Sequence, residues 1–296
     1  MVRLTVALYG GLGNQLFQYA VGKALSLRLG VPLAFDHFGF EFDKLFFKRT
    51  YEISHFMVPC DASKIRSPAL FLTSRLLFRL ARWQPAISHF LSPGLIIEKY
   101  RTFCEDIFPQ SLEKEAYMMG YWQDERYFLN IRDIILQEFK LRGVLSSSNK
   151  ILKDTLNKGQ TVAVHIRRLH NVPSSASAVP SKDPEARGVA LGVSYYQKAV
   201  EEIAKRVSKP EFFVFSDFPP WARENISFNA PTHFLEPGRG PDYEDLVLMS
   251  HCHHHIVANS SFSWWGAWLA QKENQIVIAP RNAKFLPTIP EAWIKI

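Results

Sequence analysis

Two adjacent arginines in the middle of the chain follow a segment that has the pattern of a strand. The stretch Val162 to Arg168 has apolar, mostly β-branched residues at every second position, and this period of two predicts a strand. An arginine at the end of a buried strand is costly unless it meets a counter-charge, and open α/β sheets bind ligands at the carboxyl ends of their strands. Arg167 and Arg168 therefore predict a phosphate or diphosphate site. A surface arginine pair that ends the strand is the alternative.

A glycine loop near the start of the chain suits the same chemistry. A strand predicted over Leu4 to Tyr9 leads into Gly10-Gly11-Leu12-Gly13-Asn14-Gln15, and apolar residues then recur at helical spacing up to Gly30. The free amide groups and the dipole at a helix N-terminus favour an anion. A tight turn without a ligand is the alternative for these glycines.

Neither of the two common nucleotide motifs fits this glycine loop. No Gly-Lys-Ser/Thr follows, which excludes a nucleoside-triphosphate P-loop, and Leu16 occupies the place of the third glycine of the dinucleotide fingerprint. Asp36 follows a strand-like run, Pro32 to Phe35, at about the distance expected for a ribose-binding acid. A dinucleotide oxidoreductase therefore stays open as an alternative.

Two further predicted strands end on polar residues. The strand Glu211 to Phe215 is followed by Ser216 and Asp217, and Asp217 either binds a base or ribose hydroxyl or caps the turn before Pro219-Pro220. The run Asn259-Ser260-Ser261-Phe262-Ser263 ends a strand and opens a helix. Its hydroxyls and the free helix amides form a second cradle for an anion, with ordinary helix capping as the alternative.

Strands and helices alternate from Thr161 onward, which predicts a doubly wound parallel sheet. The polar stretch Leu145 to Asn149 suggests a domain junction, so we expect domains at 1–150 and 151–296. The segment Leu169 to Gly188 has no period and follows the two arginines, which favours a lid or an acceptor loop. The predicted strands are Thr161 to Ile166, Glu211 to Phe215, Thr232 to Leu235, His255 to Ala258 and Gln275 to Ala279, and the predicted helices are near Ser194 to Val207, Tyr243 to His251 and Ser263 to Gln271.

Composition restricts the partners of the protein. The 296 residues are 47% hydrophobic, enough for two domains, and the formal charge of +7 favours an anionic partner. The sequence contains no Lys/Arg block of the kind that binds nucleic acid. Three scattered cysteines imply no disulfide framework and favour a reducing compartment. Neither a signal peptide nor a run of 18 apolar residues is present, so we expect a cytoplasmic protein without a transmembrane helix.

Two segments allow more than one interpretation. Residues 67–91 are apolar with Arg75, Arg79 and Arg82 at helical spacing, which is typical of a surface helix or of peripheral contact with an anionic membrane. The run Gly120 to Phe128 is rich in aromatic and amide side chains. It suits either a sugar site or the packing between two domains.

The histidine-rich run His251 to His255 is not expected to bind a metal ion. It crosses a predicted helix-to-strand boundary, so its side chains point in different directions. The chain also has no Asp-x-Asp element for a divalent cation, and the nearest acidic cluster is Asp242 to Asp245. A departing diphosphate would then be neutralised by arginine and helix amides.

Taken together, the motifs resemble the α-1,2-fucosyltransferases, chiefly the bacterial branch. The matching segments run in order from residue 10 to about residue 280, and the Asn-Ser-Ser-Phe-Ser-Trp-Trp-Gly run is more specific than the His-x-Arg-Arg element. They are Gly10 to Tyr19, Gly120 to Gln123, His165 to Arg168, Phe213 to Asp217 and Ala258 to Trp268.

This resemblance implies a GT-B-like α/β fold in which two Rossmann-like domains with parallel sheets face a cleft, the first on the acceptor side and the second binding GDP-fucose. It implies an inverting transfer of L-fucose from GDP-fucose to the 2-hydroxyl of a galactoside, without metal or other cofactor, in surface-glycan or O-antigen synthesis. Arg167 would hold the β-phosphate and stabilise the departing diphosphate, which suits its fixed charge and planar fork.

The resemblance also assigns the remaining donor-site residues. His165 and Asp245 would lie near the guanine or ribose, and the serines near the phosphates. Asn14 would reach fucose or phosphate across the cleft. The complete set expected to bind GDP-fucose, besides the catalytic Arg167, is Gly11, Gly13, Asn14, His165, Arg168, Ser216, Asp217, Asp245, Asn259, Ser260, Ser261 and Ser263.

Two departures from the family pattern remove acids near the donor site. The chain reads Leu169-His170-Asn171 where the family has Gly-Asp-Tyr, and Ser216-Asp217-Phe218 where Ser-Asp-Asp is common. The general base therefore stays unassigned, and His170 is one substitute whose pKa can lie near neutrality. The departures also motivate an alternative from another class, a catalytically silent nucleotide-sugar-binding homologue. The acceptor glycan and the oligomeric state do not follow from the sequence.

Overall fold

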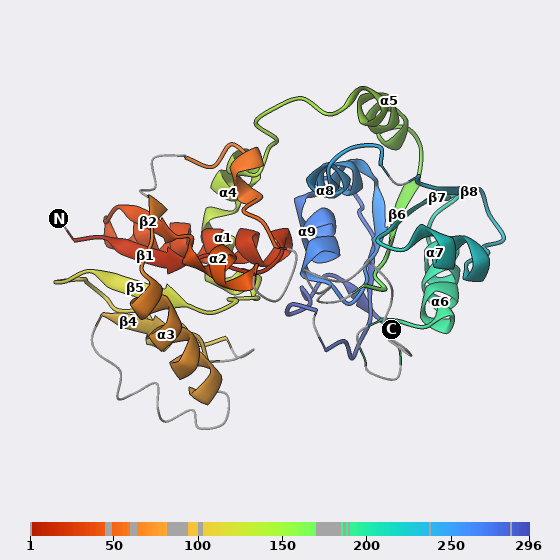
Figure 1. Cartoon of the computed structure of the whole chain (residues 1–296). Coiled ribbons are helices and arrows are strands. Elements are labelled where there is room, and N and C mark those ends of the chain that lie inside the picture. The colour runs from red at the N-terminus through yellow and green to blue at the C-terminus, as the bar shows by residue number, and fades with distance from the viewer. Residues whose placement is uncertain are drawn as a thin grey trace. The chain divides into compact units, whose positions relative to one another are not determined.

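The protein consists of two compact units, Met1–Arg142 and Gly143–Ile296 (Figure 1). The structure is a computed structural model. It describes residues 2–44, 49–59, 64–81, 94–99, 103–169, 185, 188, 190–236, 238–284 and 286–296.

The first unit contains a five-stranded sheet in the order β3-β2-β1-β5-β4, and all of its pairs are parallel. Its strands are β1 Leu4–Ala7, β2 Leu33–Asp36, β3 Lys64–Ile65, β4 Leu95–Ile97 and β5 Ala116–Met119. Its α-helices are α1 Leu12–Leu29, α2 Phe38–Asp43, α3 Pro68–Ala81 and α4 Arg132–Glu138. Its short 3-10 helices are η1 Ile53–His55, η3 Glu105–Ile107, η4 Glu125–Tyr127 and η5 Leu129–Ile131.

The second unit contains a six-stranded parallel sheet in the order β11-β10-β9-β6-β7-β8. Its strands are β6 Thr161–Ile166, β7 Glu211–Ser216, β8 Thr232–Phe234, β9 His254–Ile256, β10 Val277–Ala279 and β11 Ile294–Lys295. Its helices are α5 Ser147–Leu156, α6 Val193–Ala204, α7 Pro219–Asn225, α8 Asp242–His251 and α9 Ser261–Leu269.

The strand orders locate the ligand edge of each sheet. In the second unit the chain begins at the central strand β6, adds β7 and β8 on one side, and then returns to place β9 on the other side of β6. This is the strand order of the Rossmann fold, in which ligands bind where the order reverses, outside the carboxyl ends of the two strands concerned. The reversal falls between β6 and β9 in the second unit and between β1 and β5 in the first.

Both faces of β6 are covered, which explains why its sequence is apolar almost throughout. All six residues of β6 are buried. Val162, Val164 and Ile166 pack with residues of α6 and α7 in one core cluster. The predicted strand at 161–166 is confirmed, and Arg167 and Arg168 come after its last residue rather than within it.

The α-helices cover both faces of the first sheet as well. Val6 faces α1, where a Cβ on Gly22 would lie 2.6 Å from the Val6 side chain, so only glycine permits this approach. Ala7, on the opposite face of β1, packs in a core cluster with Phe71 and Phe78 of α3. The sheet is therefore buried on both sides, as parallel sheets generally are.

The change between units comes slightly earlier than the predicted domain boundary at 150. Residues 143–150 belong to the second unit, and α5 begins at Ser147. Glu244 explains the difference because it accepts hydrogen bonds from the Ser146 backbone N–H at 3.1 Å and from Asn149 Nδ2 at 2.7 Å. The start of α5 is thereby fixed to α8.

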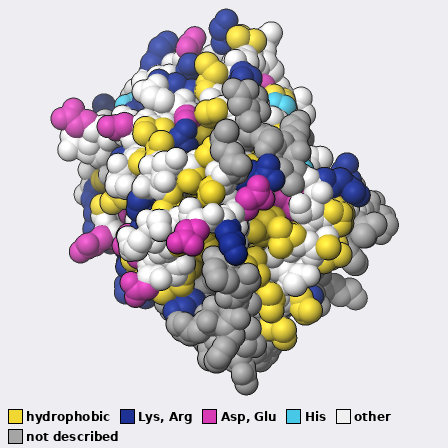
Figure 2. All heavy atoms as spheres, turned by 90° about the vertical axis from the view of Figure 1, so that its left-hand side faces the viewer, with side chains coloured by type: hydrophobic (Ala, Val, Ile, Leu, Met, Phe, Trp, Pro, Cys, Tyr) yellow, Lys and Arg dark blue, Asp and Glu magenta, His cyan; other side chains and the backbone are white. Residues whose placement is uncertain are grey.

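Helix α3 exposes leucines as well as the polar Thr73 and Arg79. Leu70, Leu72, Leu76 and Leu80 are each exposed by 42 to 58%. Figure 2, which shows the face that looks to the left in Figure 1, has exposed hydrophobic side chains among charged ones. No helix within the described part of the chain is long and apolar enough to cross a membrane. Contact of residues 67–91 with an anionic membrane stays a prediction, and Arg82 lies outside the described residues.

Two buried histidines of β9 are held in the neutral form. His255 Nε2 donates to the Met249 carbonyl at 2.8 Å while its Nδ1 accepts from Gln275 at 3.0 Å. His254 Nε2 donates to Gln160 at 2.7 Å while its Nδ1 accepts from the Ile276 N–H at 3.1 Å. Burial lowers the pKa of each imidazole to about 4.

We expect the free energy of unfolding to fall between pH 7 and pH 5. The unfolded chain binds protons below a histidine pKa of about 6.5 whereas the folded chain does not, so each histidine contributes a loss of up to about 2 kcal/mol. Urea unfolding at the two pH values measures the slope. His254→Gln/His255→Gln should flatten it, and the exposed His55→Gln should not. An unchanged slope in the double variant would contradict this origin.

Candidate active site

The carboxyl ends of β7, β6 and β9 lie side by side, because β6 pairs with the other two strands. The sequence-predicted residues of the second unit follow these three ends. His165, Arg167 and Arg168 belong to the end of β6, Ser216 and Asp217 to that of β7, and Asn259 to Ser263 to that of β9. The reversal of strand order thus brings most of the predicted donor-site residues to one edge.

Asp217 holds the loop that follows β6. Its two carboxylate oxygens accept from consecutive backbone amides, Arg168 N at 2.8 Å and Leu169 N at 2.9 Å. The Nε of Arg167 lies 3.1 Å from Asp217 Oδ2. Burial raises the pKa of this carboxyl group, and the Arg167 charge and the two amide bonds oppose that rise. Asp217 therefore fixes both the backbone and the guanidinium orientation of Arg167.

The two adjacent arginines have different surroundings. Arg168 is buried, its guanidinium carbon lies 3.8 Å from the centre of the Trp221 ring, and its Nη1 donates to Glu185 at 2.7 Å. Its charge is thus compensated within the protein. The Arg167 side chain remains 25% exposed, and its Nε forms the ion pair with Asp217. The terminal nitrogens of Arg167 are the groups suited to a bidentate anion.

His165 is a neutral imidazole at this edge. The side chain is buried, and burial together with the nearby Arg167 charge lowers its pKa to about 3. Its ring centre lies 5.7 Å from that of Phe262, in the segment after β9. Its Nδ1 is buried and has no hydrogen-bond partner within the described part of the protein. His165 can therefore offer a hydrogen bond to a ligand but not a positive charge.

The segment after β9 forms a helix N-terminus, as predicted. Ser260 is the N-cap of α9, and its Oγ accepts from Phe262 N at 3.2 Å. The hydroxyl of Ser263 is buried and accepts from Ala258 N at 3.0 Å. Asn259 donates to the Gly188 carbonyl at 2.9 Å. These side chains shape the turn, while the N-terminus of α9 begins at Ser261 and supplies the amides and dipole that favour an anion.

The tryptophans after these serines belong to the core. Trp264, Trp265 and Trp268 are buried and contact one another. Trp264 Nε1 donates to the Thr288 carbonyl at 3.0 Å. A Cβ on Gly266 would lie 3.0 Å from Met249 Cβ, which shows how closely α9 approaches α8. The aromatic half of this motif therefore anchors α9 and fixes the direction of its N-terminus.

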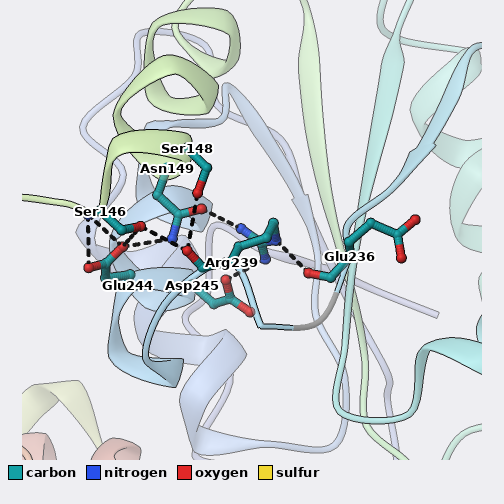
Figure 3. A network of polar contacts seen from close by, with 7 residues as sticks. All are labelled: Ser146, Ser148, Asn149, Glu236, Arg239, Glu244 and Asp245. Atoms are coloured by element: carbon teal, nitrogen blue, oxygen red, sulfur yellow. Dashed lines mark hydrogen bonds and ion pairs between the residues drawn. The ribbon is translucent and has the colours of Figure 1, made fainter.

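Asp245 belongs to a polar network at the start of α8 (Figure 3). Arg239 Nη2 donates to Asp245 at 2.6 Å, and Arg239 Nη1 donates to Asn149 Oδ1 at 2.7 Å. Burial raises the pKa of Asp245, and the Arg239 charge opposes the rise. The network connects the loop before α8 to α5. A base-binding or ribose-binding role for Asp245 stays a prediction.

The predicted residues of the first unit follow β1. Gly10 has a φ of 79°, which favours glycine, and Asp43 Oδ2 accepts its N–H at 2.9 Å. Gly11 is the N-cap of α1, and Gly13 is buried in the first turn of that helix. Asn14 Oδ1 accepts from Gln123 Nε2 at 2.9 Å. The glycine loop and the segment after β5, two motifs distant in sequence, thus meet at the reversal of this sheet.

Two interpretations fall wholly or partly outside the described residues. His170 and Asn171 are not described, and only Leu169, Glu185 and Gly188 represent the loop at 169–188.

Within the described residues no group of three or more His, Cys, Asp or Glu side chains could hold a metal ion. Independence from metal stays a prediction.

Sequence reasoning missed four residues that shape these sites. Trp221 and Glu185 hold Arg168, Arg239 holds Asp245, and Glu98 holds the loop after β5. Glu98 binds backbone amides, and the other three contact side chains to which no motif or helical spacing relates them, so periodicity and motif spacing carry no signal for these residues. Only the predicted adjacency of strand ends could have suggested them.

Two Rossmann-like units with parallel sheets define the GT-B class of glycosyltransferase fold. The crystal structure of NodZ alpha-1,6-fucosyltransferase soaked with GDP-fucose is similar, with a TM-score of 0.51 and 16% identity over 91% of this chain and 93% of that one. The sequence profile of Glycosyl transferase family 11 matches residues 3–295. The chain belongs to this family, which confirms both the fold class and the resemblance.

Three relatives show what proteins of similar sequence do. An alpha-1,2-colitosyltransferase of Escherichia coli is 32% identical over 98% of this chain and 97% of its own length. The O-antigen biosynthesis glycosyltransferase WbnK of Escherichia coli is 29% identical over 93% of each chain. Galactoside alpha-(1,2)-fucosyltransferase 2 of Pongo pygmaeus is 25% identical over 90% of this chain and 68% of its own length.

We expect Asp217→Asn to lower transferase turnover at least about tenfold, because an amide cannot accept from two backbone amides and Arg167 together. A general base in that position would shape the pH dependence, whereas a positioning residue would not. The pH–rate profile of the variant should therefore keep the wild-type shape. The exposed Asp154→Asn of α5 is the matched control. Loss of one limb of the profile, or unchanged turnover, would contradict the positioning role.

Proposed function

We propose that the protein is a galactoside 2-α-L-fucosyltransferase, which moves L-fucose from GDP-fucose to the 2-hydroxyl of a galactose-containing acceptor. Membership of family 11 supports glycosyl transfer, and relatives named for alpha-1,2 transfer support the linkage. The name of the Pongo pygmaeus relative supports a galactoside acceptor, and the neighbouring NodZ structure, soaked with GDP-fucose, supports the donor.

One arrangement carries the proposal. Arg167, whose Nε is held by Asp217, and the N-terminus of α9 follow the two strands between which the order of the second sheet reverses. Arginine and helix amides are the groups that proteins use for phosphates, and this edge is where open α/β sheets bind nucleotides. A nucleoside diphosphate sugar fits both features.

The chemistry follows from where charge develops. The acceptor oxygen forms a bond to the anomeric carbon of fucose from the side opposite GDP, and the bond from that carbon to the β-phosphate oxygen breaks. This displacement inverts the anomeric configuration. Negative charge grows on the departing β-phosphate, and Arg167 and the α9 amides stabilise it without a metal ion. The acceptor proton passes to a general base that none of the assigned residues supplies.

One alternative to fucose as the donor sugar has specific support. A relative 32% identical to this chain is named for colitose rather than fucose. Turnover with a GDP-linked colitose donor that exceeds turnover with GDP-fucose would change the sugar assignment and leave the site assignment intact. GDP binding without turnover on any acceptor would instead favour the silent homologue.

We further propose a role in surface-glycan synthesis, which the relative named for O-antigen biosynthesis supports, and a cytoplasmic location for the protein. Peripheral contact of residues 67–91 with an anionic membrane would bring the enzyme to a membrane-bound acceptor. Sedimentation with vesicles of anionic and neutral lipid would separate this contact from a merely exposed helix.

We expect the purified protein to release GDP from GDP-fucose when lactose-type acceptors are present, at the same rate with and without EDTA. The product should carry an α-1,2 linkage by nuclear magnetic resonance. Absence of GDP release with every galactoside would contradict the proposed function. Strict dependence on a divalent cation would contradict the cation-free mechanism alone.

We expect Arg167→Ala to lower turnover by about two orders of magnitude or more, which is what removal of a transition-state charge partner typically causes. Arg167→Lys should recover only part of the loss because a lysine cannot pair with Asp217 and bind a phosphate as a planar fork. The exposed Arg223→Ala of α7 is the matched control. Turnover of Arg167→Ala close to wild type would refute the assignment.

A further inference from the structure

The segment Gly120 to Gln123 follows β5 and contains none of the residues assigned to GDP-fucose binding. It joins the glycine loop at the reversal of the first sheet, where this α/β unit has its own ligand edge. Sequence alone left two interpretations of it, a sugar site and aromatic packing. The structure separates the members of the segment into these two roles.

Trp122 performs the packing role. Its side chain is fully buried and contacts Phe108 and Tyr127, with ring centres 5.5 and 5.8 Å away. Its φ is 57°, in the left-handed region, which is strained for a bulky residue. Such strain persists only where the surroundings impose it, and it concentrates at functional sites.

Glu98, at the end of β4, imposes this conformation. One carboxylate oxygen accepts from Tyr121 N at 2.6 Å and the other from Trp122 N at 2.8 Å. A Cβ on Gly120 would lie 2.4 Å from Glu98 Cβ, so glycine is required beside the carboxylate. The arrangement parallels Asp217 in the second unit, where a carboxylate after one strand likewise binds consecutive amides of the loop after the neighbouring strand.

Side-chain amides connect this loop to the glycine loop. Gln18 of α1 is fully buried, its Oε1 accepts from Tyr9 N at 3.2 Å, and its Nε2 donates to the Gly120 carbonyl at 3.2 Å. Gln123 donates to Asn14 at 2.9 Å. The half-buried Gln123 thus stands in a fixed place between two strand ends.

The Gln123 carboxamide has hydrogen-bonding capacity beyond its bond to Asn14. Of its two N–H groups and one carbonyl oxygen, one N–H meets Asn14 Oδ1. The carbonyl oxygen and the second N–H have no partner in the described part of the chain. A carboxamide that both donates and accepts is suited to a sugar hydroxyl, which also does both.

We propose that Gln123 is a specificity-determining residue that binds a hydroxyl of the acceptor galactoside in the first unit, and that Glu98 is the residue that positions it. This inference rests on the proposed function, because it names the residue that reads the acceptor of that reaction. A carboxamide in a fixed position discriminates against an acceptor analogue that lacks the hydroxyl, because the polar groups of the carboxamide are then left unpaired.

The test is a cycle of variants and acceptors. Wild type and Gln123→Ala are assayed with a galactoside and with its 3-, 4- and 6-deoxy analogues. We expect Gln123→Ala to raise the acceptor KM about tenfold, the effect of one lost hydrogen bond of about 1.4 kcal/mol. For one deoxy analogue, wild type should show a higher KM than for the parent galactoside, and Gln123→Ala should show no such increase. An equal increase in KM in both proteins for every analogue would overturn the proposal.

Matched controls distinguish a specific loss of acceptor binding from a general structural defect. Gln137→Ala replaces an exposed glutamine of α4 in the same unit and should leave the acceptor KM unchanged. Calorimetric affinity for GDP should be the same in wild type and Gln123→Ala within about twofold. A parallel loss of GDP affinity would show a general structural defect and overturn the specific role.

Glu98→Gln tests the positioning step. A glutamine offers one acceptor oxygen in place of two, so one backbone amide loses its partner. We expect the acceptor KM to rise and GDP affinity to stay constant, whereas the exposed Glu115→Gln should change neither. An acceptor KM that stays at the wild-type value in Glu98→Gln would contradict the positioning role of Glu98.

Failure of the proposed function is distinguishable from failure of this inference. A wild-type protein that transfers to no galactoside contradicts the function. Lactose titration of wild type and Gln123→Ala, followed by nuclear magnetic resonance, then decides the subsite alone. Binding by wild type that the variant loses supports it, and equal binding or no binding overturns it.

Discussion

The proposed donor site depends on the hydrogen bonds and the ion pair that connect Asp217 to the loop after β6. One carboxylate accepts from two consecutive amides and pairs with Arg167 Nε, so a single side chain sets the path of the loop and the direction of the guanidinium. Arg168 adds a second constraint because it is enclosed by Trp221 and Glu185. Arg168 is thus enclosed by the protein, whereas the Arg167 side chain stays 25% exposed, as the proposed phosphate contact requires.

The same construction occurs in both units. In each, a carboxylate after one parallel strand accepts hydrogen bonds from consecutive amides of the loop that follows the neighbouring strand. Glu98 does so beside β5 and Asp217 beside β6. Loops after parallel strands lack the ladder hydrogen bonds that fix the strands, so their amides need other partners. A carboxylate meets two of them at once and makes a ligand loop rigid. Rigid placement is what discrimination between ligands requires.

Sequence patterns predicted the fold because the fold depends on burial. The alternation along Thr161 to Ile166 and the helical spacing after Gly11 report which faces are covered, and both elements are confirmed. Patterns also placed Arg167 and Asp217 at strand ends. They could not show that Asp217 contacts Arg167 and the loop after β6, or that Glu98 has a role. Those contacts join segments remote in the chain, and a carboxylate bound to backbone amides imposes no residue type on its partners.

The affinities for GDP and GMP, which differ by the β-phosphate, test the role of Arg167 most directly. Calorimetry on wild type and Arg167→Ala forms a cycle that isolates the contact between that phosphate and Arg167. We expect wild type to prefer GDP at least about tenfold, as a charge-assisted hydrogen bond implies, and the variant to lose most of this preference. An equal preference for GDP in both proteins would contradict the central role given to Arg167.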